Sequence, residues 1–193
     1  MSDIFEADDD STSLSEEEKH DLKQKWVTTK DELNKLEAKG IFGAQVWLLG
    51  YKKDILNVQF LQKLHKKMFA DVWDWAGKFR ITEKNIGIAP YLVTSELKKL
   101  YDDVHYWIEH KTYSPKEIAL RFHHKLVQIH PFPNGNGRIS RIMADLIMKK
   151  LGQKEFSWGE GGLIKVSELR QKYIQALQKA DRGDYSGLLE LIN

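Results

Sequence analysis

Residues that suit phosphate chemistry gather in one run, His130 to Arg138, near the middle of the second half of the chain. Gly135-Asn136-Gly137 can turn successive backbone N–H groups toward one point, which makes a nest for an anion. A helix that opens at Arg138 adds its first N–H groups and its positive dipole end. Arg138 offers a planar fork to phosphate oxygens, and Arg141 follows on the same helix face. The run therefore predicts a polyphosphate-binding loop.

His130 lies at the other lip of this loop, and its imidazole can accept a proton near neutral pH. A Gly/Asn loop alone is usually a connector, and a lone histidine at a helix end is usually a capping residue. The combination favours a functional interpretation. His123 and His124 are interpreted as structural, because adjacent helical residues point about 100° apart and no acidic residue stands at ligand spacing.

Helices must position this loop, and the spacing of apolar residues predicts them. A strong helix begins at Ser114-Pro115, with an N-cap serine and a proline at the first helical position. Its apolar stripe ends at Ile129, so His130 lies at the end of the helix. Further helices are expected to begin near Ser15, over 29–48, 52–70, 94–111 and 138–151, after the glycine-rich loop at 159–162, and over 185–192.

The segment from Lys78 to Val93 differs in composition: it has two β-prone stretches around a connection that contains Asn and Gly. It predicts a β-hairpin, which must lean on the helices because two strands alone are marginal. The predicted fold is mainly α: a helical bundle with one hairpin. Residues 1–14 are expected to form a mobile acidic tail, and residues 15–193 a single domain with an N-terminal helical extension.

Composition narrows the function classes. The chain has 193 residues, and its formal net charge is only +2, which argues against a general nucleic-acid or membrane-surface binder. It contains no cysteine, so thiol catalysis and cysteine metal sites are excluded. The N-terminus shows no signal-peptide pattern and no apolar run suits a bilayer, so the expected compartment is the cytoplasm.

The residues of this loop and of the segment before the expected hairpin resemble those of a known protein family. His130-Pro131-Phe132, followed by Asn134-Gly135-Asn136-Gly137-Arg138 and Arg141, resembles the signature of the Fic family. Trp73 to Arg80 with the expected hairpin is similar to the family's flap region, and about 33–193 is consistent with a full Fic core. Thr28 to Trp47 further resembles the bacterial branch named mobile mystery protein B.

The resemblance implies a role for each matching residue. His130 is expected to be the general base that deprotonates a Ser, Thr or Tyr hydroxyl of a target protein. Asn136 with the Gly135 and Gly137 amides is expected to hold the α-phosphate of ATP. Arg138 is expected to grip the β-phosphate and Arg141 the γ-phosphate. Phe132 is expected to be a structural anchor, and Tyr173 is expected to be an adenine-pocket residue. The flap residues expected to dock the target are Thr82, Asn85, Ile86 and Gly87.

Two positions matter for the type of transfer. The metal-binding position of the family motif is usually acidic, and here it is Asn134. A neutral amide is a weaker ligand for Mg²⁺ than a carboxylate, so Mg²⁺ is expected but more loosely held. Gly137 stands where the Doc-like branch carries lysine, which favours nucleotidyl over phosphoryl transfer.

Glu32 has two interpretations. Thr28 and Glu32 have the spacing of the inhibitory helix of many Fic proteins, whose glutamate pairs with the second arginine. However, Leu33 occupies a position that is usually Gly or Asn, and Thr29-Lys30-Asp31-Glu32 also fits an N-terminal capping box.

The sequence therefore predicts a protein adenylyltransferase that transfers AMP from ATP to a protein hydroxyl. Two alternatives stay open: a Fic-type transferase of another group (UMP, phosphoryl or phosphocholine), and a catalytically weakened nucleotide-binding module. An antitoxin-like regulator is a further expected partner, whereas nucleic acid and membrane are not.

Overall fold

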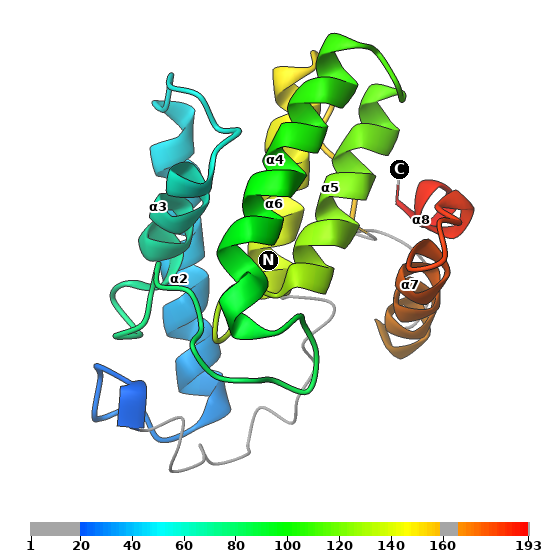
Figure 1. Cartoon of the computed structure of the whole chain (residues 1–193). Coiled ribbons are helices and arrows are strands. Elements are labelled where there is room, and N and C mark those ends of the chain that lie inside the picture. Colours follow the sequence, from blue (N-terminus) through cyan, green and yellow to red (C-terminus); the bar gives the residue numbers. More distant parts are fainter. Residues whose placement is uncertain (1–19, 159–165, 193) are drawn as a thin grey trace. The chain divides into compact units, whose positions relative to one another are not determined.

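A computed structural model describes residues 20–158 and 166–192 of the chain (Figure 1). The expected acidic tail, the helix start near Ser15 and the glycine-rich loop at 159–162 lie outside the described residues. The chain divides into two compact units. Unit 1 comprises Met1–Arg80 and Phe132–Gly135, and unit 2 comprises Ile81–Pro131 and Asn136–Asn193.

Unit 1 is built on two helices, α2 (Lys30–Leu49) and α3 (Val58–Phe69), which pack side by side (Figure 1). Buried residues of α3 recur at helical spacing, and they include Leu61, Leu64 and Met68. A Cβ atom at Gly40 would collide with the backbone carbonyl of Met68, so this glycine lets the two helices approach closely.

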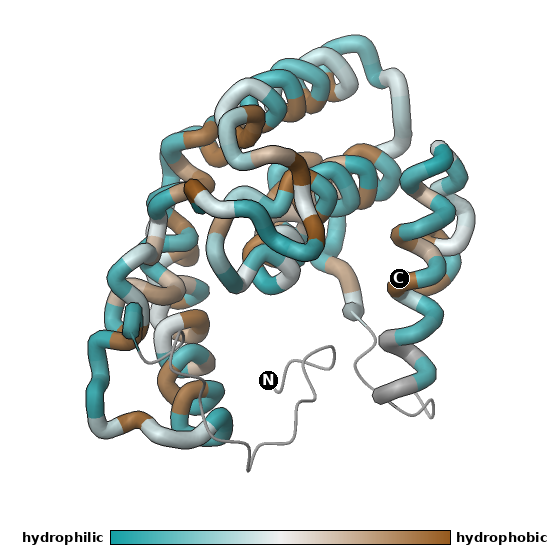
Figure 2. Tube along the Cα trace, turned by 60° about the horizontal axis from the view of Figure 1, so that its bottom comes forward, coloured by the Kyte–Doolittle hydropathy of each residue, from teal (hydrophilic) through white to brown (hydrophobic). Residues whose placement is uncertain are grey.

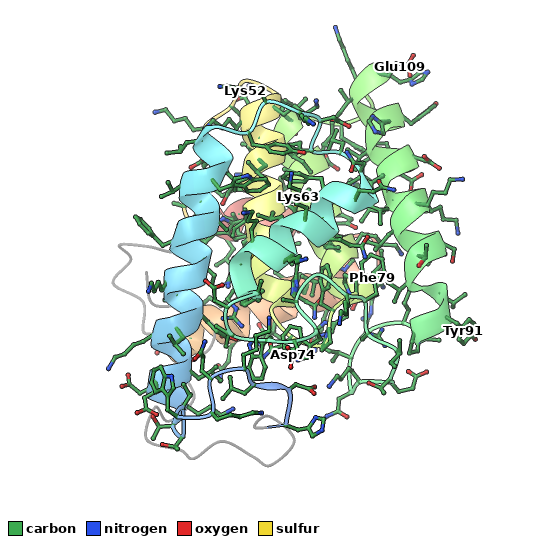
Figure 3. The ribbon with its side chains drawn as sticks, turned by 90° about the vertical axis from the view of Figure 1, so that its left-hand side faces the viewer. Lys52, Lys63, Asp74, Phe79, Tyr91 and Glu109 are labelled. Atoms are coloured by element: carbon green, nitrogen blue, oxygen red, sulfur yellow. The ribbon has the colours of Figure 1, made fainter. Side chains whose placement is uncertain are left out.

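A second support of unit 1 is polar. The indole of Trp73, which follows α3, donates a hydrogen bond of 2.6 Å to the buried carboxylate of Glu37 on α2. Leu22 and Trp73 also form an isolated antiparallel bridge. Figure 3 shows the face of the ribbon that carries α2 and α3, with Asp74 and Phe79 labelled in the segment after α3.

The expected helix over 52–70 is wrong at its start. Gly50 caps the end of α2, and α3 begins only after Asn57, whose side chain accepts a hydrogen bond from the N–H of Phe60 at 2.8 Å. Asp54 likewise accepts from the N–H of Leu56. Asp and Asn side chains that bond the nearby backbone compete with helix formation, which breaks the helical pattern here.

Unit 2 contains η1 and the helices α4 to α8. The 3₁₀ turn η1 (Pro90–Leu92) leads into α4 (Val93–Glu109), which packs on α5, and α5 in turn packs on α6 (Figure 1). A further pair, α7 and α8, packs together. Their bounds are α5 Pro115–Ile129, α6 Asn136–Lys150, α7 Val166–Ala180 and α8 Ser186–Leu191.

The predicted mainly α class is confirmed, but the hairpin is not. Residues 78–89 contain bends and irregular backbone without strand pairing, and Pro90 then opens η1. In the described part of the chain there is no further strand to support a hairpin, and an isolated hairpin is marginal. Gly87 at φ 104° and the proline add further breaks.

Figure 2 shows apolar and polar residues alternating along the helices, as amphipathic helices require. Within the described ranges, none of the helices has the length and apolarity needed to cross a bilayer.

Candidate active site

The C-terminal end of α5 presents His130. Ser114 caps the other end of this helix, its side chain accepting from the N–H of Glu117, as predicted. His130 ends α5 in the left-handed conformation, at φ 53° and ψ 60°. That conformation costs an L-residue about 1–2 kcal/mol, and helices normally end there with glycine. A histidine held in a glycine conformation points to a side chain needed for function.

The next residues of the loop, Phe132–Gly135, belong to unit 1 and pack against α3. Phe132 is 0% exposed. Its ring stacks on the imidazole of His65 with a centroid separation of 3.7 Å and an interplanar angle of 11°, and it also contacts Phe79. This burial fits the expected role of Phe132 as the loop's anchor.

Asn134 and Gly135 form the tip of this packed stretch. The side chain of Asn134 is exposed, and its Oδ1 accepts a hydrogen bond of 2.6 Å from the N–H of Gly135. Gly135 has φ 76°, and a Cβ there would lie 2.6 Å from Cε2 of Phe69 and 3.4 Å from Nε2 of His65. Only glycine fits, because the backbone is left-handed and the ring of Phe69 already fills the space.

The first turn of α6 contains the other predicted phosphate-binding residues. The helix begins at Asn136, two residues before the expected start at Arg138, so Asn136 and Gly137 belong to the turn whose N–H groups lack intrahelical acceptors. Gly137 is exposed, and a Cβ there would meet nothing within 4 Å. Asn136 and the Arg138 side chain are buried, at 2% and 8% exposed.

Unit 2 therefore brings His130, Asn136, Gly137, Arg138 and Arg141 to the joined ends of two packed helices, α5 and α6. This end combines a proton acceptor, a helix N-terminus and two guanidinium groups. Such a set can hold phosphate oxygens beside a base.

Arg141 also influences buried groups on α5 and α6. Burial first, and then the positive charge of Arg141, lowers the pKa of His123 to about 3. Burial raises the pKa of Asp145 to about 6, against the hydrogen bonds donated by the Trp158 indole and the Phe156 N–H. His123 is thus neutral at ordinary pH and takes no part in charge binding.

The hydroxyl of Tyr173 on α7 lies 2.7 Å from Nε2 of His123, and Tyr173 is only 8% exposed. His124 is bound at both ring nitrogens, by Asp181 at 2.8 Å and by the Tyr185 hydroxyl at 3.0 Å. These bonds account for both histidines as structural residues. The acidic neighbour Asp181 lies 57 positions along the chain from His124, so local spacing gave no sign of it. The adenine-pocket role of Tyr173 stays a prediction.

The residues expected to dock the target lie on an open segment. Thr82, Asn85, Ile86 and Gly87 are all exposed. Two apolar side chains of the same segment face solvent: Ile81 is 91% exposed and Ile86 is 59% exposed.

Glu32 caps α2. Its Oε2 accepts hydrogen bonds from the N–H groups of Thr28, at 2.9 Å, and Thr29, at 3.2 Å, while the Thr29 hydroxyl accepts from the Glu32 N–H. The predicted capping box is confirmed. The N–H groups of Thr28 and Thr29 hold the pKa of Glu32 below its usual value.

The donor set for a metal is sparse. Within the described ranges, no group of three or more His, Asp or Glu side chains lies at metal-binding distance. Asn134 offers one neutral oxygen, and it already accepts from Gly135. Mg²⁺ usually keeps several waters and binds through substrate phosphates with one or two protein oxygens. The residues therefore fit an ion that arrives with a nucleotide, not a resident one.

His65 was missed from the sequence, and Gly77 was identified only as part of the segment Trp73 to Arg80 that resembles the flap region. His65 lies on the apolar face of α3 between Leu61 and Phe69, and it is 0% exposed. A polar residue in an apolar stripe signals a buried group that needs partners. That signal was present, although the partners come from distant parts of the chain.

Comparisons with known proteins agree with this geometry. The sequence profile of the Fic/DOC family matches residues 55–148. Protein adenylyltransferase fic-1 of Caenorhabditis elegans is 31% identical over 146 residues, which is 71% of this chain and 26% of that protein. A probable protein adenylyltransferase of Aquifex aeolicus is 34% identical over 96 residues, 49% of this chain and 26% of that protein. The chain thus spans about a quarter of the length of these curated relatives.

Solved structures show the same fold. A structure of Fic-1 from C. elegans superposes with a TM-score of 0.66 at 26% identity, covering 82% of this chain and 47% of that one. BepC of Bartonella tribocorum, solved with bound AMPPNP, superposes with a TM-score of 0.68 at 18% identity, covering 95% and 92%. With its family profile, its Fic-fold neighbours and the loop from His130 to Arg141, this chain carries a Fic/DOC domain over residues 55–148.

Proposed function

We propose that the protein is an adenylyltransferase that transfers AMP from ATP to a hydroxyl of a target protein. The observation that carries the proposal is His130, held in a left-handed conformation at the end of α5, beside the first turn of α6. Curated relatives bear the name protein adenylyltransferase, and a related fold was solved with the ATP analogue AMPPNP.

In this proposal His130 takes the proton from a Ser, Thr or Tyr hydroxyl. The hydroxyl oxygen then bonds to the α-phosphorus, the bond to the β-phosphate oxygen breaks, and pyrophosphate leaves. Backbone N–H groups of Gly135 and Gly137, with Asn136, stabilise the charge that grows on the α-phosphate. Arg138 and Arg141 hold the departing phosphates.

Mg²⁺ belongs to the proposal as an ion bound to the nucleotide phosphates. It would neutralise phosphate charge, with the Oδ1 of Asn134 as its protein ligand. Before Asn134 can bind an ion, or Gly135 a phosphate, their mutual hydrogen bond must open.

The target is proposed to dock along residues 81–87. This segment is exposed and forms no β-strand, and Ile81 and Ile86 offer apolar side chains to a partner. An extended peptide can bond such a backbone by strand addition. The missing hairpin is consistent with this view, because the pairing partner would be the target itself. We further propose a cytoplasmic location for the protein and an antitoxin-like regulator as its partner, and we propose that the chain belongs to the mobile mystery protein B branch.

Labelled ATP tests the proposal. The protein, its Glu32→Ala variant and its His130→Ala variant are each incubated with a cell lysate and ATP labelled at the α- or the γ-phosphate. AMP transfer predicts label on protein from α-labelled ATP only, and none above background with His130→Ala. Label from the γ-phosphate would instead mean phosphoryl transfer. If neither label exceeds the His130→Ala background in the Glu32→Ala protein, the proposed chemistry is wrong.

A second candidate, a nucleotide-binding module without transfer, is favoured by the neutral Asn134 at the metal position. It predicts ATP binding that His130→Ala leaves unchanged, together with no label on any protein.

A further inference from the structure

His65 is a buried polar residue to which the proposed function assigns no role. It lies on α3, is 0% exposed, and is surrounded by the rings of Phe69, Trp75 and Phe132. Taking an imidazole out of water is unfavourable unless its nitrogens find hydrogen-bond partners. Both ring nitrogens of His65 do so, and each partner is a backbone group distant in sequence.

The two bonds define the state of the ring. Nδ1 accepts from the N–H of Gly77 at 3.0 Å. A backbone N–H only donates, so Nδ1 carries no proton, and in the neutral ring the proton is on Nε2. Nε2 lies 3.1 Å from the carbonyl oxygen of Asn134, which can only accept. The two partners therefore require the neutral, Nε2-protonated tautomer.

The same ring contacts the loop in other ways. It stacks on Phe132 at 3.7 Å between centroids, and its Nε2 limits the space beside Gly135, where a Cβ would lie 3.4 Å away. One imidazole thus contacts Phe132 and Asn134 and limits the space beside Gly135 in the four-residue stretch Phe132–Gly135.

Gly77 is fixed from α3 as well. Its N–H bonds His65 and its carbonyl accepts from the side chain of Gln62 at 3.3 Å. Its φ is 81°, and a Cβ would lie 2.8 Å from the Cβ of Lys66. The turn at Gly77 therefore gives His65 a rigid support on the side away from Asn134.

We propose that His65 is a positioning residue that links the turn at Gly77 to the stretch Phe132–Gly135 and so sets the geometry of Asn134 and Gly135. The inference rests on the proposed function, because positioning matters only if this stretch binds a nucleotide. His65 itself need not touch the substrate.

Three substitutions separate the contacts. His65→Asn keeps an acceptor near the place of Nδ1 and loses the donor to Asn134. His65→Gln keeps a donor near the place of Nε2 and loses the acceptor for Gly77. His65→Phe keeps a ring against Phe132 and loses both bonds. Each is assayed for kcat and KM with ATP, for ATP affinity by calorimetry, and for thermal unfolding.

We expect His65→Asn to lower kcat about 10- to 100-fold, since small misplacements of a site can cost about 10²-fold. His65→Gln should stay within about 5-fold of the parent, because it keeps the bond to the loop. His65→Phe should lose at least as much as His65→Asn. If His65→Asn and His65→Phe unfold with the parent's midpoint and keep its kcat and KM, the inference is wrong.

A spectroscopic readout does not depend on activity. ¹⁵N shifts of the imidazole in the unmodified protein should show a bare Nδ1 and a protonated Nε2, with slow exchange of the Nε2 proton. A protonated Nδ1 would overturn the inference even if every variant failed to fold. Conversely, an unmodified protein with the expected ring signals and no ATP binding or transfer would refute the proposed function and leave the link through His65 intact.

Discussion

The loop between α5 and α6 has two parts that are built in opposite ways. Phe132–Gly135 is packed: Phe132 is fully buried, and Gly135 presses its backbone against Phe69. His130 and the first turn of α6 instead offer an imidazole and backbone N–H groups to a ligand. The backbone is strained at His130, and Gly137 is exposed. Most of the packing contacts thus fall on Phe132–Gly135, whereas the proton acceptor and the helix N-terminus lie on either side of it, and substitutions of near neighbours should separate effects on stability from effects on transfer.

The largest expected effect is at His130. His130→Gly should lower transfer by about 10²- to 10⁴-fold, the usual worth of a general base. The same change should leave stability unchanged or raise it by up to about 1 kcal/mol, because glycine tolerates the left-handed conformation. Transfer assays and urea unfolding measure the two effects. His130→Ala, which keeps the backbone strain, is the matched control. A large loss of stability in His130→Gly would contradict this division.

The two loop glycines give the sharpest contrast. Gly135→Ala should lose about 2–4 kcal/mol of stability, from left-handed strain and overlap with Phe69, and transfer should fall with it. Gly137→Ala places its methyl group in open space and keeps the N–H, so its stability should change by less than about 1 kcal/mol. Thermal unfolding of both variants decides this. Equal losses would mean that the two parts of the loop are not distinct.

Substitutions of Glu32 test whether α2 controls His130 and the first turn of α6. Glu32→Gln can still accept the N–H groups of the capping box but carries no charge. If Glu32 pairs with Arg141 as an inhibitor, Glu32→Gln and Glu32→Ala should both raise transfer several-fold. If it only caps α2, Glu32→Ala should lower the unfolding midpoint and neither variant should raise transfer.

The charge of Glu32 also has a pH signature. Its pKa is lowered in the folded state, so its contribution to stability is present above the unfolded pKa and is lost as the pH falls through the folded value. Glu32→Gln should remove that dependence. An unchanged acid limb of the stability profile would show that the cap bonds do not depend on the carboxylate charge.

Asn134 lies at the end of the packed part, and its replacement should tune metal use. Asn134→Asp supplies a charged oxygen, so the Mg²⁺ concentration for half-maximal transfer should fall several-fold. Titration of Mg²⁺ at saturating ATP measures this, with Asn134→Ala as the control that removes the oxygen. If all three proteins share one Mg²⁺ dependence, Asn134 is not a ligand.

The smallest expected effect concerns Asp145, inside α6. Its folded pKa of about 6 lies above the ordinary aspartate value of 3.8, so the folded state binds more protons than the unfolded state between these values. Stability should therefore fall as the pH rises through this window and then level off. Asp145→Asn should flatten that slope, as measured by urea unfolding from pH 4 to 7. A slope unchanged by Asp145→Asn would assign the dependence to other groups.

Local chemistry explains what the sequence predicted well. The caps at Thr29 and Ser114, the helix stripes and the ends of α4 and α5 depend on neighbours within a turn or two. The loop from His130 to Arg138 was identifiable because phosphate binding requires glycines, amides and arginines in close succession. Its resemblance to a known family then supplied roles for the single residues.

What the sequence could not predict depends on distant contacts. The partners of His65 are Gly77 and Asn134, the latter 69 positions away. The β-prone residues from Lys78 to Val93 predicted strands, but a strand needs a partner, and no pattern within the segment reveals its absence. The helical spacing over 52–70 predicts a helix that includes Asp54 and Asn57, but their side chains bond the nearby backbone and α3 begins only after Asn57.

The hydrogen bond from Gly135 N–H to Asn134 Oδ1 has a consequence for how a nucleotide enters. The amide oxygen occupies the donor that a phosphate would use, so binding exchanges one acceptor for another. The net gain from this donor is then only the difference between a charged and a neutral acceptor, about 1 kcal/mol. A carboxylate in its place would hold the donor more firmly and would need a cation to draw it away. With asparagine, the loop can open for a nucleotide without that cation, and the neutral residue makes entry less dependent on metal.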